Sequence, residues 1–180
     1  MKIDFLNIFK PATYKKGIFF MIDDERYLIA YFGRQSDYYL EKYKAYHQGD
    51  RTTFNIGPFL AGVFWFLYRK LYKQLIIVMI AIIVLGFIEV LLYDLFDIGD
   101  DTQNVFDFLL TWVFGGILGF LGNRLYFEQA DKKINRILSE TSDEDERIRN
   151  LTRAGGVSWT PFVLLGLLIV AFLVLNNTDF

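Results

Sequence analysis

Apolar residues are gathered along this chain into long runs that polar segments separate. The clearest run, LIIVMIAIIVLGFIEVLLY at 75–93, has 19 residues and a single charge. As an α-helix at ~1.5 Å per residue it would be about 28 Å long, close to the ~30 Å hydrocarbon thickness of a bilayer. Two further apolar runs occupy 105–127 and 157–175. The pattern predicts three transmembrane helices.

A fourth apolar stretch, FNIGPFLAGVFWFLYRK at 54–70, is different because it is short and rich in aromatic residues. Its apolar part, 56–68, would make a helix of only about 20 Å. Aromatic rings mixed with cations are typical of the headgroup boundary. We expect a short interfacial or re-entrant helix, although a strongly tilted crossing of a thinned bilayer remains open. The expected lipid anchors are Trp65, Tyr68, Arg69, Lys70, Tyr72 and Lys73.

Loop charges orient the predicted spans. The loop DLFDIGDDTQN at 94–104 has four aspartates and no cation, whereas cations precede the first run and follow the second one. Cytoplasmic loops carry an excess of Lys and Arg. The amino terminus is therefore predicted in the cytoplasm and the carboxyl terminus outside, in a multi-pass membrane protein.

The polar segments are predicted to form small cytosolic units. In the amino-terminal part we expect an amphipathic helix over 1–9 and a β-hairpin over 18–32 around Asp23-Asp24-Glu25. A helix over 36–47, capped by Ser36, would carry three tyrosines on one side, Tyr39, Tyr43 and Tyr46.

After the second run, one helix is expected to continue to residue 139, and SDED at 142–145 is typical of a capping box that opens another helix. The predicted fold is a mainly α membrane protein with three transmembrane helices, a short interfacial or re-entrant helix, a small cytosolic α+β segment and a cytosolic helical hairpin. Its expected parts are the amino-terminal segment 1–53, the aromatic helix 54–73, two spans 74–127, the hairpin 128–156, and the third span with its external tail 157–180.

Composition narrows the chemistry. The chain is 53% hydrophobic, has a formal net charge of -2, and contains no cysteine and one histidine. Without a basic footprint we expect no nucleic-acid partner. Without cysteine there is no thiolate nucleophile, and the lone His47 is expected to be solvated rather than to bind a metal. We therefore predict no catalytic residue, no cofactor and no metal site.

Polar residues inside the apolar runs are the remaining candidates for chemistry. Glu89 is the only acid deep within a run, and intramembrane carboxylates are functional candidates by default. Near the outer end of its span, beside Asp94 or Asp107, it can form a proton or cation site, or simply reach headgroups and water. Asn123 and Arg124, at the cytosolic end of the second span, are candidates for bonding helix ends or lipid phosphate.

Glycines in the second run form stripes of small residues, which let another helix backbone approach closely. We expect them to pack against the first or third span, and self-association is the alternative. These residues are Gly115, Gly116, Gly119 and Gly122.

Three segments together resemble a known family. In order they read SDYYLEKYKAY, FNIGPFLAGVFWFLYRKLY and GNRLYFEQADKKI, and they extend from about residue 33 to residue 137. They are similar to small bacterial membrane proteins called domain of unknown function 2628, which share a Tyr-Tyr-rich helix, a segment like FNWAAFFFGPLWFLYRKMY and a later Gly-Asn-Tyr-Leu-Tyr motif. Asn55-Ile56-Gly57-Pro58 departs from their usual Asn-Trp-Ala-Ala. The resemblance implies a bacterial cytoplasmic-membrane protein without an assigned activity.

We therefore expect a non-enzymatic integral membrane protein that serves as a scaffold, docking or assembly partner at the cytoplasmic face of a bacterial inner membrane. Its expected partners are membrane lipids and an unidentified protein or a second copy. The alternative is an oligomeric small transporter or channel subunit that uses Glu89 and Asp107.

Overall fold

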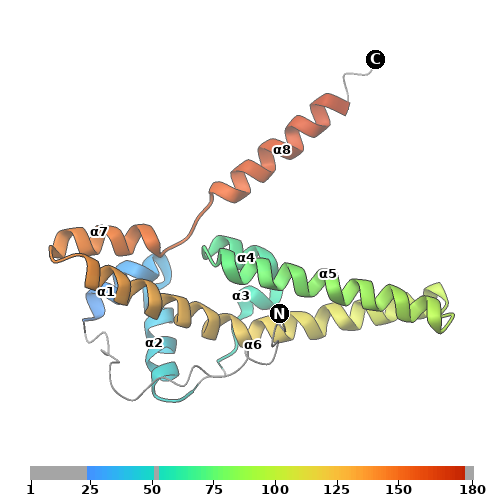
Figure 1. Cartoon of the computed structure of the whole chain (residues 1–180), viewed down its shortest axis with the longest axis horizontal. Coiled ribbons are helices and arrows are strands. Elements are labelled where there is room, and N and C mark those ends of the chain that lie inside the picture. Colours follow the sequence, from blue (N-terminus) through green and yellow to red (C-terminus); the bar gives the residue numbers. More distant parts are fainter. Residues whose placement is uncertain (1–23, 51–52, 177–180) are drawn as a thin grey trace, which may run out of the picture.

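The computed structural model describes residues 24–50 and 53–176, and every regular element in these ranges is a helix. Two long helices, α5 (Tyr72–Leu95) and α6 (Asp100–Glu140), form an antiparallel hairpin (Figure 1). The first half of α6 lies beside α5. Its second half continues into a group of shorter helices. The 41 residues of α6 confirm that the second apolar run and the following polar segment form one helix.

A helical platform surrounds the second half of α6. It consists of this half of α6 with α1 (Glu25–Phe32), α2 (Ser36–His47) and α7 (Glu144–Ala154). Its core is aromatic: the ring centroid of Phe32 lies 5.7 Å from that of Tyr39, 5.6 Å from that of Tyr43 and 5.7 Å from that of Tyr126. Such tilted and edge-on ring contacts stabilise a core beyond simple burial.

The predicted hairpin over 18–32 is wrong in its described part, because residues 25–32 form α1. The Asp24 side chain caps this helix by accepting a hydrogen bond from the Arg26 backbone N–H at 3.0 Å. Leu28, Tyr31 and Phe32 are buried, and their spacing of three and four residues defines one helix face. The other predicted strand and the predicted helix over 1–9 lie outside the described residues, which contain no strand.

The helix over 36–47 is confirmed, with its three tyrosines buried on one face. Ser36 is not its cap: it is the first helical residue, and a short 3-10 turn, η2 (Gly33–Gln35), leads into the helix. The helix after residue 142 is also confirmed as α7. Its cap is Asp143, whose side chain accepts a hydrogen bond from the Glu146 backbone N–H at 2.9 Å.

The aromatic stretch forms two short helices rather than one. They are α3 (Ile56–Ala61) and α4 (Val63–Tyr68), and the chain breaks between them at Gly62, where φ is 52°. At ~1.5 Å per residue each helix is about 9 Å long, so neither is long enough to cross a bilayer. α3 packs on α6 and α4 packs on α5, which ties the stretch to the base of the hairpin.

Two helices, α5 and α6, are long and apolar enough to span a membrane. The third apolar run forms α8 (Thr160–Asn176), which is apolar but shorter. Side chains from Val163 to Val174 are exposed, and Figure 1 shows α8 diverging from the hairpin. A third span stays a prediction.

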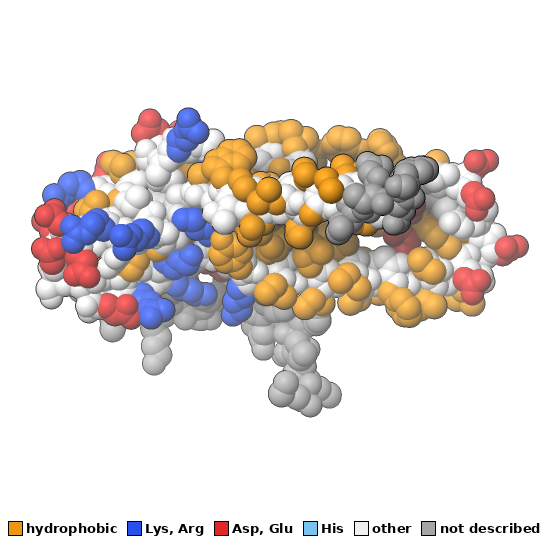
Figure 2. Space-filling model, turned by 90° about the horizontal axis from the view of Figure 1, so that it is seen from above, with side chains coloured by type: hydrophobic (Ala, Val, Ile, Leu, Met, Phe, Trp, Pro, Cys, Tyr) orange, Lys and Arg blue, Asp and Glu red, His pale blue; other side chains and the backbone are white. Residues whose placement is uncertain are grey.

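Charge and apolar surface are separated along the hairpin. Figure 2 shows an apolar band between an acidic end and an end where cations and acids mix. The acidic end is the loop that joins α5 to α6 together with the adjoining helix ends, and the mixed end is the platform.

Candidate functional site

A buried arginine lies where the hairpin meets the platform. Arg69 follows α4 and is 2% exposed. Its guanidinium carbon lies 4.3 Å from the ring centroid of Tyr39, 5.3 Å from that of Tyr126 and 5.7 Å from that of Tyr68. Arg69 Nη2 donates a hydrogen bond to Gln35 Oε1. Within the described ranges no carboxylate pairs with this cation, so aromatic faces provide most of its electrostatic partners.

Arg69 contacts tyrosine rings, whereas the next residue, Lys70, binds the end of α7. Its backbone has φ 58°, and its Nζ donates to the carbonyl of Arg153 at 3.0 Å and to that of Gly155 at 2.6 Å. Lys133 Nζ donates to the Ala154 carbonyl at 3.3 Å. These carbonyls end α7, where the helix dipole favours cations. Burial lowers the pKa of Lys70 from its ordinary value.

Gly155 allows α7 to end directly against α1. A Cβ added at Gly155 would lie 2.0 Å from the carbonyl oxygen of Tyr31, and the backbone N–H of Gly156 donates to that oxygen at 2.7 Å. Only a residue without a side chain fits this approach. The Arg69-Lys70 pair and this glycine therefore join α1, α2, α6 and α7 at one point.

A pair of buried amides joins the aromatic stretch to α6. Asn55 Nδ2 donates to Asn123 Oδ1 at 2.7 Å, and Asn123 Nδ2 donates to Thr53 Oγ1 at 3.1 Å. The Asn55 backbone N–H also donates to the Gly119 carbonyl at 2.9 Å. Asn55 caps α3, since its Oδ1 accepts from the Gly57 N–H. Asn123, predicted as a polar site within the membrane region, thus bonds protein groups.

The glycine stripe of α6 faces this same stretch. An added Cβ would lie 2.4 Å from Phe54 Cε2 at Gly119 and 2.4 Å from Pro58 Cγ at Gly122. At Gly115 it would lie 3.1 Å from the Phe59 carbonyl oxygen, whereas Gly116 faces open space. For Gly115, Gly119 and Gly122 the predicted packing partner, the first or third span, was wrong: the close approach is to residues 54–59, because these short turns lie directly on α6.

The predicted lipid anchors divide into two groups. Trp65, Arg69 and Lys70 face the protein, since Trp65 is buried and both cations bind other elements. For these residues the structure contradicts anchoring in lipid. Tyr72 and Lys73 are exposed at the start of α5, and the ring centroid of Tyr68 lies 5.3 Å from that of Trp159.

The two predicted acids meet near the acidic loop. The hydroxyl of Tyr93 lies 2.8 Å from Glu89 Oε1 and 2.8 Å from Asp107 Oδ1. A phenol carries one proton, so the Tyr93 hydroxyl donates to one of the two carboxylates at a time. The sequence left Asp94 and Asp107 as alternative neighbours of Glu89 and did not point to Tyr93, which lies one helical turn after Glu89.

A second polar cluster lies in the platform and was missed. Asp131 is 4% exposed, accepts a hydrogen bond from the Tyr43 hydroxyl and lies 3.4 Å from His47 Nε2. The prediction of a solvated His47 was therefore wrong. The signal was available, because Asp131 continues the buried face of α6 that includes Phe127 and Ile134. Within the described ranges, no group of three metal-ligating residues is found.

Fold and site together define a small helical protein whose two span-length helices join a platform through a buried arginine in an aromatic setting. Residues 27–132 match the family described as Protein of unknown function (DUF2628), and the chain belongs to this family. No curated protein and no solved structure matches the chain. The matched range contains Tyr39, Arg69 and Tyr126, one from each of the three resembling segments, and these residues meet at the buried arginine.

Proposed function

We propose that this protein is a non-enzymatic integral membrane protein that docks or assembles a partner at the cytoplasmic face of a bacterial inner membrane. The observation that carries the proposal is the connection at Arg69. The guanidinium contacts α2 through Tyr39 and α6 through Tyr126, while Lys70 bonds the end of α7. These contacts hold the platform rigidly at the base of the membrane hairpin, and a docking surface needs such a fixed position.

Charge supports the orientation. The platform carries most of the cations, whereas the α5–α6 loop carries only acids. With the positive-inside rule, the platform lies in the cytoplasm and the acidic loop outside. The outer surface of the platform offers charges of both signs for a polar partner, including Glu41, Lys44, Glu144 and Arg149, all exposed.

The buried position of Arg69 favours structure over catalysis. A catalytic cation must reach a substrate, and this guanidinium is enclosed by rings from three segments. We therefore assign it to holding the platform, and we propose no reaction.

Site-specific photo-crosslinking in intact cells tests this function. Probes at Tyr38 and Arg149, both exposed on the platform, are expected to capture the same protein partner or a second copy. A probe at Thr102, in the first turn of α6 next to the acidic loop, is the matched control and should not capture it. Identical adducts from all three positions, or none from the platform of the folded protein, would contradict the proposal. Reporter fusions at Gln48, at Thr102 and at the carboxyl terminus test the orientation independently.

An oligomeric transporter or channel subunit is the second candidate, favoured by the contact of Tyr93 with both Glu89 and Asp107. Two acids at one end of a membrane hairpin would suit a proton or cation that passes along an assembled path. The variants Glu89→Gln and Glu89→Leu distinguish a transport role from the docking role. An unchanged cellular phenotype in both variants would remove the transport role, whereas loss in Glu89→Leu alone would point to polarity rather than charge.

A further inference from the structure

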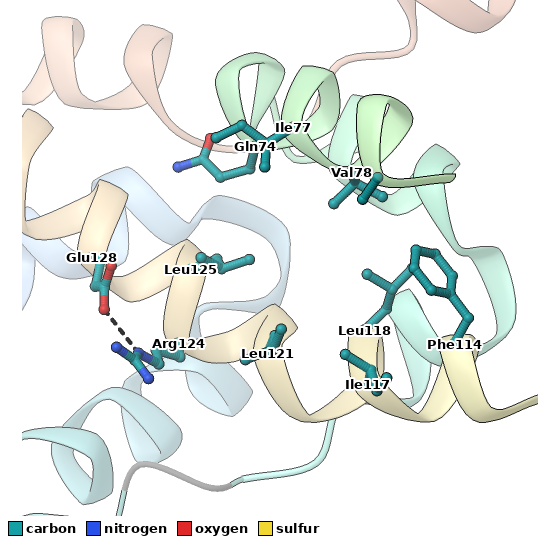
Figure 3. A pocket seen from close by; sticks show the side chains of 11 residues that line it. Gln74, Ile77, Val78, Phe114, Ile117, Leu118, Leu121, Arg124, Leu125 and Glu128 are labelled. Atoms are coloured by element: carbon teal, nitrogen blue, oxygen red, sulfur yellow. Dashed lines mark hydrogen bonds and ion pairs between the residues drawn. The ribbon is translucent and has the colours of Figure 1, made fainter. Parts of the chain in front are cut away.

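A groove lies between α5 and α6 at the platform end of the apolar band. Its volume is about 150 Å³, and its wall is almost entirely apolar, as Figure 3 shows. The apolar lining residues are Ile77, Val78, Ala81, Phe114, Ile117, Leu118, Leu121 and Leu125. An apolar wall offers ordered water no hydrogen-bond partners. In a bilayer, the material available to fill it is a lipid acyl chain.

Polar groups line only the platform end of the groove. They are Gln74 from the start of α5 and the ion pair of Arg124 with Glu128 on α6, whose Nε and Oε1 are 3.0 Å apart (Figure 3). Gln74 Oε1 is buried and accepts no hydrogen bond from the described residues. A buried acceptor of this kind favours a donor from a bound molecule.

Along α6, the apolar wall is followed first by a cation and then by an acid. Leu121 belongs to the apolar wall, Arg124 follows at its edge, and Glu128 lies one turn further out, at ~1.5 Å per residue about 6 Å beyond Arg124. A phospholipid with an amine headgroup has the same order: acyl chains, then an anionic phosphate, then a cationic ammonium. The side chains of Arg124 and Glu128 are 22% and 24% exposed, so both are reachable.

From this order we propose that the groove binds a zwitterionic phospholipid with a primary amine headgroup, the phosphoethanolamine class. An acyl chain lies along the apolar wall, Arg124 donates to the phosphate, and Glu128 accepts from the ammonium. A lipid with a glycerol headgroup offers no cation to Glu128, and a choline headgroup offers no N–H donor. The inference rests on the proposed membrane embedding and adds a lipid partner to it.

Native mass spectrometry of the full chain tests the proposal with phosphatidylethanolamine, phosphatidylcholine and phosphatidylglycerol of identical acyl chains. We expect phosphatidylethanolamine to bind most tightly. Glu128→Gln is expected to remove its advantage over phosphatidylcholine, whereas Arg124→Gln weakens both by roughly tenfold, since both use the phosphate contact.

Arg136→Gln is the matched control, because Arg136 and Glu140 form an equivalent pair on the same helix at 2.8 Å, outside the groove. It should leave lipid binding unchanged. Ala81→Phe, which fills the groove without changing a charge, should weaken all three lipids. The exchange Arg124→Glu with Glu128→Arg keeps the pair and the net charge, and should lose the preference even if single variants fold poorly.

Equal binding of the three lipids, a stronger preference for phosphatidylglycerol, or an unchanged preference in Glu128→Gln would overturn the proposal. Carbonate extraction of vesicles, which removes proteins that are not embedded in the bilayer, distinguishes failure of the lipid proposal from failure of the proposed function. Release of the protein by carbonate would refute membrane embedding itself, whereas retention without headgroup preference would refute the groove alone.

Discussion

The guanidinium of Arg69 lies 4.3 Å from the ring centroid of Tyr39, although Tyr39 lies within α2 and Arg69 directly follows α4. A buried cation without a carboxylate partner is costly unless other groups stabilise it. Here tyrosine rings from α2 and α6 surround it. This contact makes the platform and the hairpin base one folding unit.

Arg69→Ala should therefore lower the free energy of unfolding by about 3 kcal/mol, because it removes desolvated cation–π contacts and leaves a cavity. The free energy of unfolding is measured in mixed detergent micelles as the fraction of denaturing detergent is increased. Arg136→Ala, an exposed arginine of α6, is the control and should change stability by less than about 0.5 kcal/mol. Equal stability of the two variants would show that the buried cation contributes nothing.

Gly155→Ala should destabilise the platform by more than about 2 kcal/mol, because its Cβ would lie 2.0 Å from a backbone oxygen of Tyr31. Gly86→Ala on α5 has open space around its Cβ and should be neutral or slightly stabilising, since alanine is the better helix former. The two melting temperatures, measured in the same detergent, provide the check. A Gly155 variant as stable as the Gly86 variant would mean that α7 does not end against α1.

The two buried amides should couple energetically. Asn123→Ala leaves the Asn55 side chain without its acceptor, and Asn55→Ala leaves Asn123 without its donor. Each single variant should lower the free energy of unfolding by about 2 kcal/mol. In the double variant the loss should fall short of the sum by about 1 kcal/mol, because both partners of one bond are gone. A double-mutant cycle of unfolding free energies measures this coupling. Strict additivity would exclude a bond between the two.

Alkaline pH should weaken the platform through Tyr31. Burial raises the pKa of Tyr31 to about 12, while Gln129 and Arg69 oppose the rise and Asp131 supports it. The unfolded chain loses this proton near its ordinary pKa of 10.0, so the stability contribution is complete below about pH 10 and is lost as pH rises toward 12. Tyr31→Phe should show a shallower loss of stability over this window in pH-dependent melting. The same slope in both proteins would disprove the assignment.

Several features followed from sequence alone. The length and apolar character of residues 75–93 predict a span-length helix, and α5 contains them. The tyrosine spacing in 36–47 predicts one buried face, which α2 shows. The hairpin prediction failed over α1 because a short apolar run carries both strand and helix periodicities, and the cap at Asp24 was read as part of a turn.

The sequence by itself determined the long helices, the position of the charges and the three segments that mark the family, since these depend on local composition and periodicity. Only the tertiary structure decided that Arg69 faces tyrosine rings instead of lipid and that the glycines of α6 receive residues 54–59. The physical reason is that aromatic and cationic side chains are equally suited to a membrane interface and to a buried ring contact. Which environment they meet depends on residues distant in the chain.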